Sequence, residues 1–277
     1  MSSLTMLEGA KGVLEQMWKM AFEKRSEIDS PERSRCRATR CLPGEIAPYV
    51  LLPGDPSRAL MIAQSWLDDA SLVMANREFH SYTGTYKGVP VSVISTGLGS
   101  PGASMVVQDL PKLNVRAAIR VGTAGTADPT IRPGDVLVAT GAVRDEGSSK
   151  KHLPECFPAV ADLNVTNALL NAGRKLTDRI SYGIVSTSDG FSFPSLAAER
   201  DLYSSAGVRA FEMEAAAVMI LAQVNKIAAG CILSIDGYVA DVAKGNTQPS
   251  SELRDKGINI AINAALDAIL VLAAQDA

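Results

Sequence analysis

From residue 47 onward, short apolar runs alternate with longer segments that have the period of an α-helix. The runs at 49–54, 116–125 and 227–236 have the length of strands and end in Gly, Pro, Thr or Asp. The segments at 160–176 and 258–275 consist mostly of good helix formers. Strands that alternate with helices predict a layered α/β domain rather than an all-α or all-β fold.

Residues 1–40 differ in composition from the rest of the chain. Apolar residues recur at helical spacing from Leu7 to Phe22, which predicts a short amphipathic helix. The stretch 30–40 contains four arginines and little apolar content, as expected of an exposed linker. We therefore predict an N-terminal extension over 1–40, made of this helix and the basic linker, and one main domain over 41–277.

Composition excludes several classes of partner. The chain has 277 residues, 47% of them hydrophobic, and a formal net charge of −3, so nothing indicates nucleic acid or an anionic membrane surface. The four cysteines lack metal-ligand spacing, and no metal site is expected. No apolar run reaches the roughly 18 residues that would span a bilayer, and no secretion signal is evident. We expect a cytoplasmic protein with reduced thiols.

Ligands of layered α/β folds bind at the carboxyl ends of the strands. The segments that come after the predicted strands are unusually rich in Gly, Ser, Thr and Asp; they are "GDPSR", "STGLGSPG", "RVGTAGT", "STSDGFSF" and "SIDGY". Arginines accompany two of these segments. The sequence therefore predicts one polar site built from several strand ends.

Two of these segments have the chemistry of a phosphate site. Gly54 lets backbone approach a ligand, and Arg58 comes four residues later. Arg120 precedes a loop whose amides and Thr123 hydroxyl converge on an anion. Neither segment is a Walker A or a dinucleotide-binding fingerprint. The alternative is that both are tight turns with surface arginines.

The stretch "AFEMEAAAVMILA", residues 210–222, is apolar except for Glu212 and Glu214. From Ala215 onward it predicts a buried helix. One interpretation makes the two glutamates first-turn residues that are stabilised by the helix dipole. The other directs them into a cleft, where carboxylates accept hydrogen bonds from ligand hydroxyls.

Asp236 comes directly after the apolar run "CILSI". Partial burial there would raise the pKa of its carboxyl group and suit it to general acid catalysis. The alternative is an ordinary turn aspartate before Gly237.

Nine segments, in order, resemble the nucleoside phosphorylase family that contains the hexameric-type purine nucleoside phosphorylases and the uridine phosphorylases. They are "PGDPSR", "NREFHSYTGTYKG", "STGLGSPGAS", "RVGTAGT", "GDVLVATGAVRDEG", "FPAVAD", "STSDGF", "FEMEAA" and "ILSIDG", and they span roughly residues 45–272. The resemblance implies a single catalytic domain with a three-layer α/β/α architecture and a mixed central β-sheet. It also implies phosphorolysis of a nucleoside to a free base and a pentose 1-phosphate in nucleoside salvage, with inorganic phosphate as co-substrate and no cofactor.

The resemblance assigns residue roles as well. Phosphate would be held by Gly54, Arg58, Arg120, Thr123 and, from a neighbouring subunit, Arg77. The nucleoside would be held by Phe191 stacked on the base, Glu212 near the base, and Met213 and Glu214 at the ribose. In the purine branch, the residue that matches Asp236 donates a proton to N7 of the leaving base. A shared site of this kind implies a homo-oligomer, either a dimer or a hexamer.

The chain departs from the family pattern at three places. The N-terminal histidine that binds the 5′-hydroxyl is expected near Ala38, where there is none. The Gln-x-Arg of uridine phosphorylases is missing after Phe191. The arginine that assists the aspartate in some purine enzymes has no evident counterpart after Asp236. The missing Gln-x-Arg and the presence of Asp236 favour a purine nucleoside phosphorylase. The alternatives are a uridine phosphorylase, a nucleoside hydrolase and a non-catalytic nucleoside-binding protein.

Overall fold

The computed structural model describes residues 35–190, 194–240 and 251–276. The chain divides into two compact units, and the second unit, Cys36–Ala277, contains every strand and helix of the described residues. Of the predicted extension, residues 1–34 lie outside the described residues. The last part of the predicted linker, from Cys36, belongs to the second unit.

The strands form one mixed sheet, as predicted. They are β1 (Tyr49–Leu52), β2 (Asp68–Asn76), β3 (Phe79–Tyr86), β4 (Val89–Ile94), β5 (Ala117–Thr126), β6 (Val136–Asp145), β7 (Ala159–Val160), β8 (Ile180–Ser188), β9 (Ala210–Glu212) and β10 (Ala228–Tyr238). The order is β10-β6-β8-β9-β5-β1-β4-β3-β2, and β10 also pairs with β5, so part of the sheet closes on itself. The central pairings of β5 with β1 and β10 are parallel, which brings their carboxyl ends to one edge.

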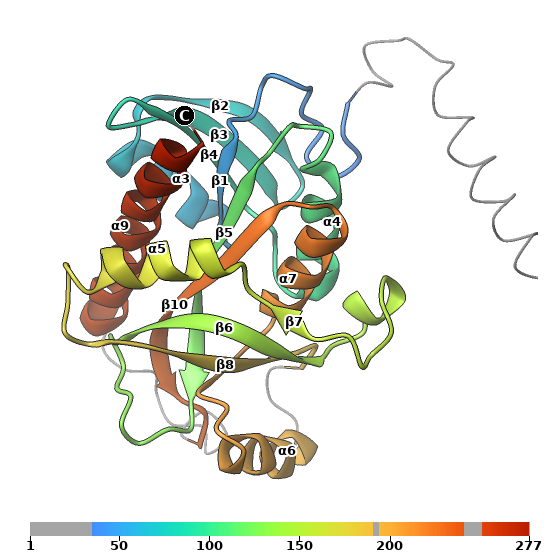
Figure 1. Cartoon of the computed structure of the whole chain (residues 1–277), viewed down its shortest axis with the longest axis vertical. Helices are drawn as coiled ribbons and strands as arrows, with labels where there is room; N and C mark the ends of the chain where they lie inside the picture. The colour runs from blue at the N-terminus through green and yellow to red at the C-terminus, as the bar shows by residue number, and fades with distance from the viewer. Residues whose placement is uncertain (1–34, 191–193, 241–250, 277) are drawn as a thin grey trace, which may run out of the picture. The chain divides into compact units, whose positions relative to one another are not determined.

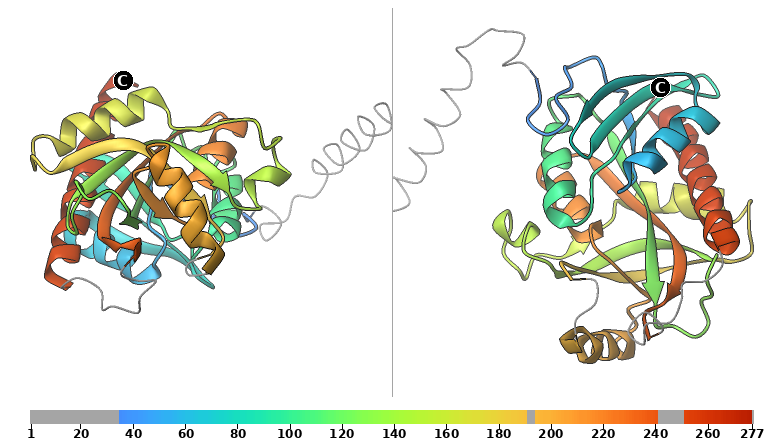
Figure 2. Two further views of the ribbon diagram at one scale, coloured as in Figure 1. Left: turned by 90° about the horizontal axis from the view of Figure 1, so that it is seen from below. Right: turned by 180° about the vertical axis from the view of Figure 1, so that it is seen from behind.

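Helices cover both faces of the sheet (Figure 1 and Figure 2). They are α3 (Pro56–Trp66), α4 (Ser100–Asp109), α5 (Leu163–Gly173), α6 (Pro194–Ser205), α7 (Ala215–Val224), α9 (Ser251–Gln275) and the 3₁₀ turn η1 (Ser149–Lys151). One apolar core lies under α4 and α7, and the other lies under α3, α5 and α9. This is the expected three-layer α/β/α arrangement.

Over Glu252–Gln275, helix α9 is long and apolar enough to span a membrane, and no other helix among the described residues is. This corrects the expectation that no segment is long and apolar enough. The helix packs on α5 and β10, and 56% of its most apolar window is buried, as in the core helix of an α/β domain.

The start of the second unit is fixed by one buried carboxylate. Asp109, at the end of α4, accepts hydrogen bonds from the backbone amides of Arg37, Ala38 and Thr39 at 3.2, 2.9 and 2.8 Å and from the Thr39 hydroxyl at 3.0 Å. Ala38, the place where a histidine was expected, is buried in this contact.

Candidate active site

A cavity of about 850 Å³ opens at the carboxyl ends of β1, β5 and β10. Of the site residues predicted from the sequence, it is lined by Gly54, Arg58, Arg120, Thr123, Glu212, Met213, Glu214 and Asp236. Segments far apart in the chain therefore meet at this one edge of the sheet, as strand ends in parallel arrangement require. A cavity of this size is in the usual range for small-molecule sites.

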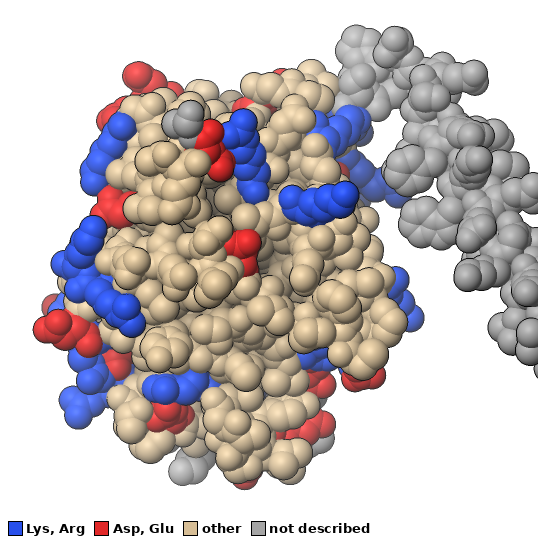
Figure 3. All heavy atoms as spheres, in the orientation of Figure 1, with Lys and Arg blue, Asp and Glu red and all other residues tan. Residues whose placement is uncertain are grey.

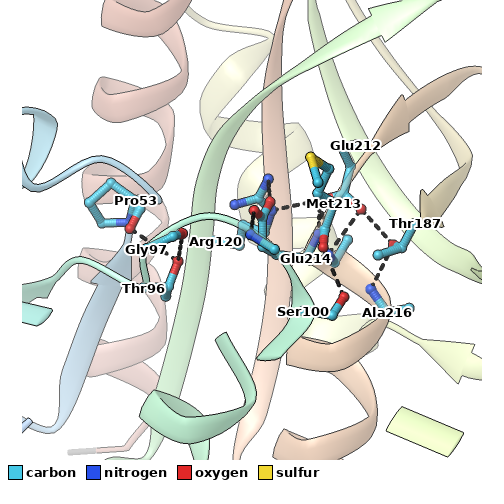
Figure 4. A network of polar contacts seen from close by, with 12 residues as sticks. Pro53, Thr96, Gly97, Ser100, Arg120, Thr187, Glu212, Met213, Glu214 and Ala216 are labelled. Carbon is cyan, nitrogen blue, oxygen red and sulfur yellow. Dashed lines mark hydrogen bonds and ion pairs between the residues drawn. The ribbon is translucent and has the colours of Figure 1, made fainter. Parts of the chain in front are cut away.

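In the wall of the cavity, the guanidinium of Arg120 pairs with two carboxylates (Figure 4). Its Nε lies 2.9 Å from Oε2 of Glu212, and its Nη2 lies 2.5 Å from Oε2 of Glu214. All three side chains are buried. Burial acts to lower the pKa of Arg120, but the carboxylates of Glu214 and Glu212 outweigh it and raise the pKa above the ordinary value. The guanidinium is therefore permanently charged and held in one orientation.

Glu212 ends β9 and anchors the start of α7. Its carboxylate accepts hydrogen bonds from the Thr187 hydroxyl at 2.5 Å and from the amides of Glu214 and Ala215 at 2.8 and 2.9 Å. The amides at a helix start lack intrahelical partners and carry partial positive charge, so they stabilise this carboxylate. Glu212 thus joins both interpretations of the sequence: it binds the helix start and it lines the cleft.

Glu214 occupies the N-cap position of α7, and its carboxylate accepts a hydrogen bond from the Gly99 amide at 2.5 Å. Burial raises the pKa of Glu214, whereas Arg120 opposes that shift. The Ser100 hydroxyl donates to the Met213 carbonyl at 2.8 Å, which fixes the backbone between the two glutamates. Helix α7 begins at Ala215, as predicted, and residues 210–212 before it form strand β9.

The part of the cavity next to β1 and α3 combines a close backbone approach with arginines. A Cβ added to Gly54 would lie 3.3 Å from the Gly97 carbonyl, so backbone lines the cavity there. Arg58 lies in the first turn of α3, which Asp55 caps by accepting from the Ser57 amide at 2.8 Å. Burial, then the positive charge of Arg120, lowers the pKa of Arg58. The positive charges of Arg58 and Arg120 repel each other, and an anion bound between the two side chains would relieve that repulsion.

Asp236 lies at an irregularity in β10. The register of β10 on β5 shifts between Ile235 and Gly237, which is a β-bulge at Asp236. Bulges re-aim side chains and often occur beside active sites. Burial raises the pKa of Asp236, while the Thr123 hydroxyl and the arginines Arg254 and Arg58 oppose the shift. A partly desolvated carboxyl group of this kind is suited to donate a proton.

Arg254 is a positively charged residue near Asp236 that comes after it in the sequence. It lies on α9, and its charge acts on Asp236 and on Arg58. A smaller cavity of about 360 Å³, adjacent to the main one, is lined by Arg254, Asp236, Arg58 and Thr123. Sequence spacing alone did not identify this residue, because α9 returns it to the site from far along the chain.

Two predicted site residues are not brought into this cavity within the described chain. Arg77 is exposed in the turn between β2 and β3, with a positive φ of 55°, and it does not line the cavity. Phe191 lies outside the described residues. Sequence reasoning in turn missed several lining residues, including Leu98, Arg200, Phe211 and Val239. Among the described residues, no group of three or more His, Cys, Asp or Glu side chains could hold a metal ion.

The layered fold thus places Arg58, Arg120, Thr123 and Asp236 around one cavity. Residues 48–274 match the phosphorylase superfamily, and the chain belongs to that family. Within it, the chain is an enzyme of the nucleoside phosphorylase class.

Known relatives include enzymes of both substrate branches. The chain is 42% identical over 207 residues to a uridine phosphorylase of Thermococcus kodakarensis, covering 70% of this chain and 74% of the relative. It is 33% identical over 232 residues to a guanosine phosphorylase of Halorubrum lacusprofundi, covering 83% of this chain and 95% of the relative. The crystal structure of a Toxoplasma gondii purine nucleoside phosphorylase in complex with immucillin-H superposes with a TM-score of 0.81 and 30% identity, covering 87% of this chain and 98% of that one.

Proposed function

We propose that the chain catalyses phosphorolysis of purine nucleosides: phosphate attacks the anomeric carbon, the glycosidic bond breaks, and a free base and a pentose 1-phosphate are released. The observation that carries this proposal is the joint lining of one cavity by Arg58, Arg120 and Thr123 at one end and by Asp236 on the β10 bulge. A hydrolase, which uses water, has no use for that cradle. A binding protein has no use for a desolvated acid.

Phosphate is the first substrate to be assigned. Gly54, Arg58, Arg120 and Thr123 hold it, and Arg77 of a neighbouring subunit completes the cradle. The arginines orient the nucleophile, and the phosphate charge stabilises the cationic sugar of the transition state. No cofactor takes part.

The nucleoside lies beyond the phosphate. Met213 packs on the sugar, and Glu214 accepts hydrogen bonds from the 2′- and 3′-hydroxyls. Glu212 lies near the base and also holds Arg120 in position. Phe191 stacks on the base. Asp236 protonates N7 of the purine, which then leaves as a neutral base, and Arg254 positions that carboxyl group.

A uridine phosphorylase is the second candidate, and the 42% identity to an enzyme of that name favours it. Uracil has no N7, so Asp236 would lack its proton acceptor there. We further propose a homo-oligomer with shared sites, either a dimer or a hexamer, that works in the cytoplasm in nucleoside salvage.

The test is base release from inosine, guanosine, uridine and adenosine, each with and without phosphate. The proposal expects release from inosine or guanosine that requires phosphate. Equal rates without phosphate would identify a hydrolase, and faster cleavage of uridine would move the enzyme to the other branch.

A further inference from the structure

Thr187 is a side chain of β8 that contacts the ion-paired part of the site from behind. It is fully buried and is not among the described residues that line the cavity. Its hydroxyl lies 2.5 Å from Oε1 of Glu212 and accepts from the backbone amide of Ala216 at 2.9 Å (Figure 4). Because that amide can only donate, the single hydroxyl hydrogen of Thr187 points to the carboxylate. Thr187 therefore joins β8 to the end of β9 and to the first turn of α7.

The hydrogen bond from Thr187 bears on how the Glu212 carboxylate is turned. Oε2 of Glu212 accepts from Nε of Arg120 at 2.9 Å and from the Glu214 amide at 2.8 Å. Among the described residues, the partners of Oε1 are the Thr187 hydroxyl and, at 3.0 Å, the Ala215 amide, which Oε2 shares. The Glu212 side chain has no exposed surface, so water does not replace a donor that is lost.

This balance of donors is transmitted to Arg120. The terminal torsion of a glutamate is broad, so a carboxylate that loses a donor on one oxygen turns to improve its remaining contacts. Such a turn would draw Oε2 of Glu212 away from Nε of Arg120, and Glu214 would be left as the carboxylate that holds the guanidinium. An anion bound to a guanidinium without a fixed orientation is held less tightly.

We propose that Thr187 is a positioning residue of the phosphate cradle: its hydroxyl fixes the Glu212 carboxylate, which in turn fixes the guanidinium of Arg120. The inference rests on the proposed function, because it takes Arg120 to bind phosphate. Thr187 acts through these two side chains and touches neither substrate, since it lies behind the cavity wall.

Thr126 of β5 provides a matched control. It is also fully buried, and its hydroxyl donates to the Arg209 carbonyl at 2.7 Å and accepts from the Asp128 amide at 3.0 Å. Thr126 and its two partners lie outside the described lining of the cavity. Valine at either position keeps the branched shape and removes a hydroxyl with one donor and one acceptor partner. Thr187→Val and Thr126→Val should therefore lower the melting temperature by similar amounts.

The test is calorimetric titration of the full chain with inorganic phosphate, which needs no turnover. We expect the phosphate Kd to rise by about 10-fold or more in Thr187→Val, as for loss of one hydrogen bond to a charged group, and by no more than about two-fold in Thr126→Val. Thr187→Ser keeps the hydroxyl and should restore most of the affinity. The phosphate KM for a cleaved nucleoside should change in parallel with Kd.

A wild-type phosphate Kd in Thr187→Val, or equal changes in the two valine variants, would overturn the inference. If Thr187→Val does not fold, Thr187→Cys takes its place: its thiol is a weak donor, so an intermediate Kd supports the inference and a wild-type Kd overturns it.

Arg58→Ala separates this failure from failure of the proposed function. If phosphate binding weakens in Arg58→Ala but not in Thr187→Val, the cradle stands and the role of Thr187 is rejected. If binding weakens in both variants although the wild-type protein cleaves no nucleoside, the positioning role is supported and phosphorolysis is rejected.

Discussion

The guanidinium of Arg120 forms ion pairs with two buried carboxylates, those of Glu212 and Glu214. Removing it therefore affects stability as well as binding. Without Arg120, Glu212 and Glu214 remain buried at 6% and 4% exposure and lose their shared counter-charge. Breaking a buried ion pair from one side costs about 3–5 kcal/mol. These residues of the candidate site therefore also stabilise the folded domain.

We predict that Arg120→Ala lowers both the melting temperature and the affinity for phosphate, whereas Arg58→Ala lowers mainly the latter. Arg58 is half-buried, and the carboxylates whose charges act on it, Asp55 and Asp236, are exposed and half-buried, so its loss costs less stability. The phosphate KM should rise by about 10- to 100-fold in Arg58→Ala, the equivalent of one charge-assisted contact. Thermal melts and phosphate kinetics measure the two effects, and an unchanged phosphate KM in Arg58→Ala would remove this residue from the cradle.

Asp236 is predicted to act as an acid, and this role has a specific kinetic signature. Asp236→Asn keeps the shape but supplies no proton, so kcat on inosine should fall by about 10²-fold or more. The loss on 7-methylguanosine should be much smaller, because its base already carries the positive charge. Equal losses on both substrates would show that Asp236 is structural.

The pH profile serves as the control for that variant. Burial raises the pKa of Asp236 in the folded protein, so the protonated form persists to higher pH than in an ordinary aspartate. Wild-type turnover of inosine should fall as the pH rises through that pKa, and this limb should be absent in Asp236→Asn.

At the scale of elements, the apolar runs predicted β1, β5 and β10, and the helical periodicity predicted α5, α7 and α9. The β2–β3 hairpin was missed because β2 is largely exposed and its apolar residues do not alternate with polar ones. Helix α3 was missed because its start, "PSR", directly follows the turn residues Gly54 and Asp55, although Asp55 caps the helix and Pro56 occupies its first turn.

The candidate site was predictable where a motif lies at a strand end, as for Arg58, Arg120 and Asp236. It was not predictable where the contacts of a residue depend on how distant elements pack together. The pairing of Arg120 with Glu212 and Glu214 depends on how β9 and α7 lie against β5. Arg254 and Arg200 reach the site from helices whose sequences carry no motif.

One prediction at this scale concerns the segment that begins the second unit. Asp109→Ala removes the acceptor of three backbone amides and the Thr39 hydroxyl, so we expect a loss of about 1–3 kcal/mol in unfolding free energy. Trypsin should then cleave faster at Arg37 and Arg40. Asp109→Asn, which keeps one acceptor oxygen, should be intermediate, and wild-type melting and cleavage of both variants would contradict the structural role of this carboxylate.

For the whole molecule, the proposed sharing of sites rests on Arg77, which is exposed outside the chain's own cavity. The face in Figure 3 carries basic and acidic side chains interspersed around a broad, mostly uncharged area. We predict that the protein is an oligomer, at least a dimer. The molecular mass of the protein in solution tests this prediction.

Complementation tests the sharing itself. Arg77→Ala leaves the acid intact, and Asp236→Asn leaves Arg77 intact. Co-assembled chains should therefore regain activity, because one site of each mixed pair receives both residues. If the mixture is no more active than the mean of the two separate variants, Arg77 does not act across an interface.

The central claim is that phosphate, not water, attacks the sugar in this cavity, and ³¹P NMR of a reaction with inosine or guanosine observes that step directly. We expect a pentose 1-phosphate resonance that grows at the rate of base release, while the inorganic phosphate signal declines equally. Arg58→Ala should slow both changes together at limiting phosphate. Base release with no loss of inorganic phosphate and no new phosphorus resonance would contradict phosphorolysis.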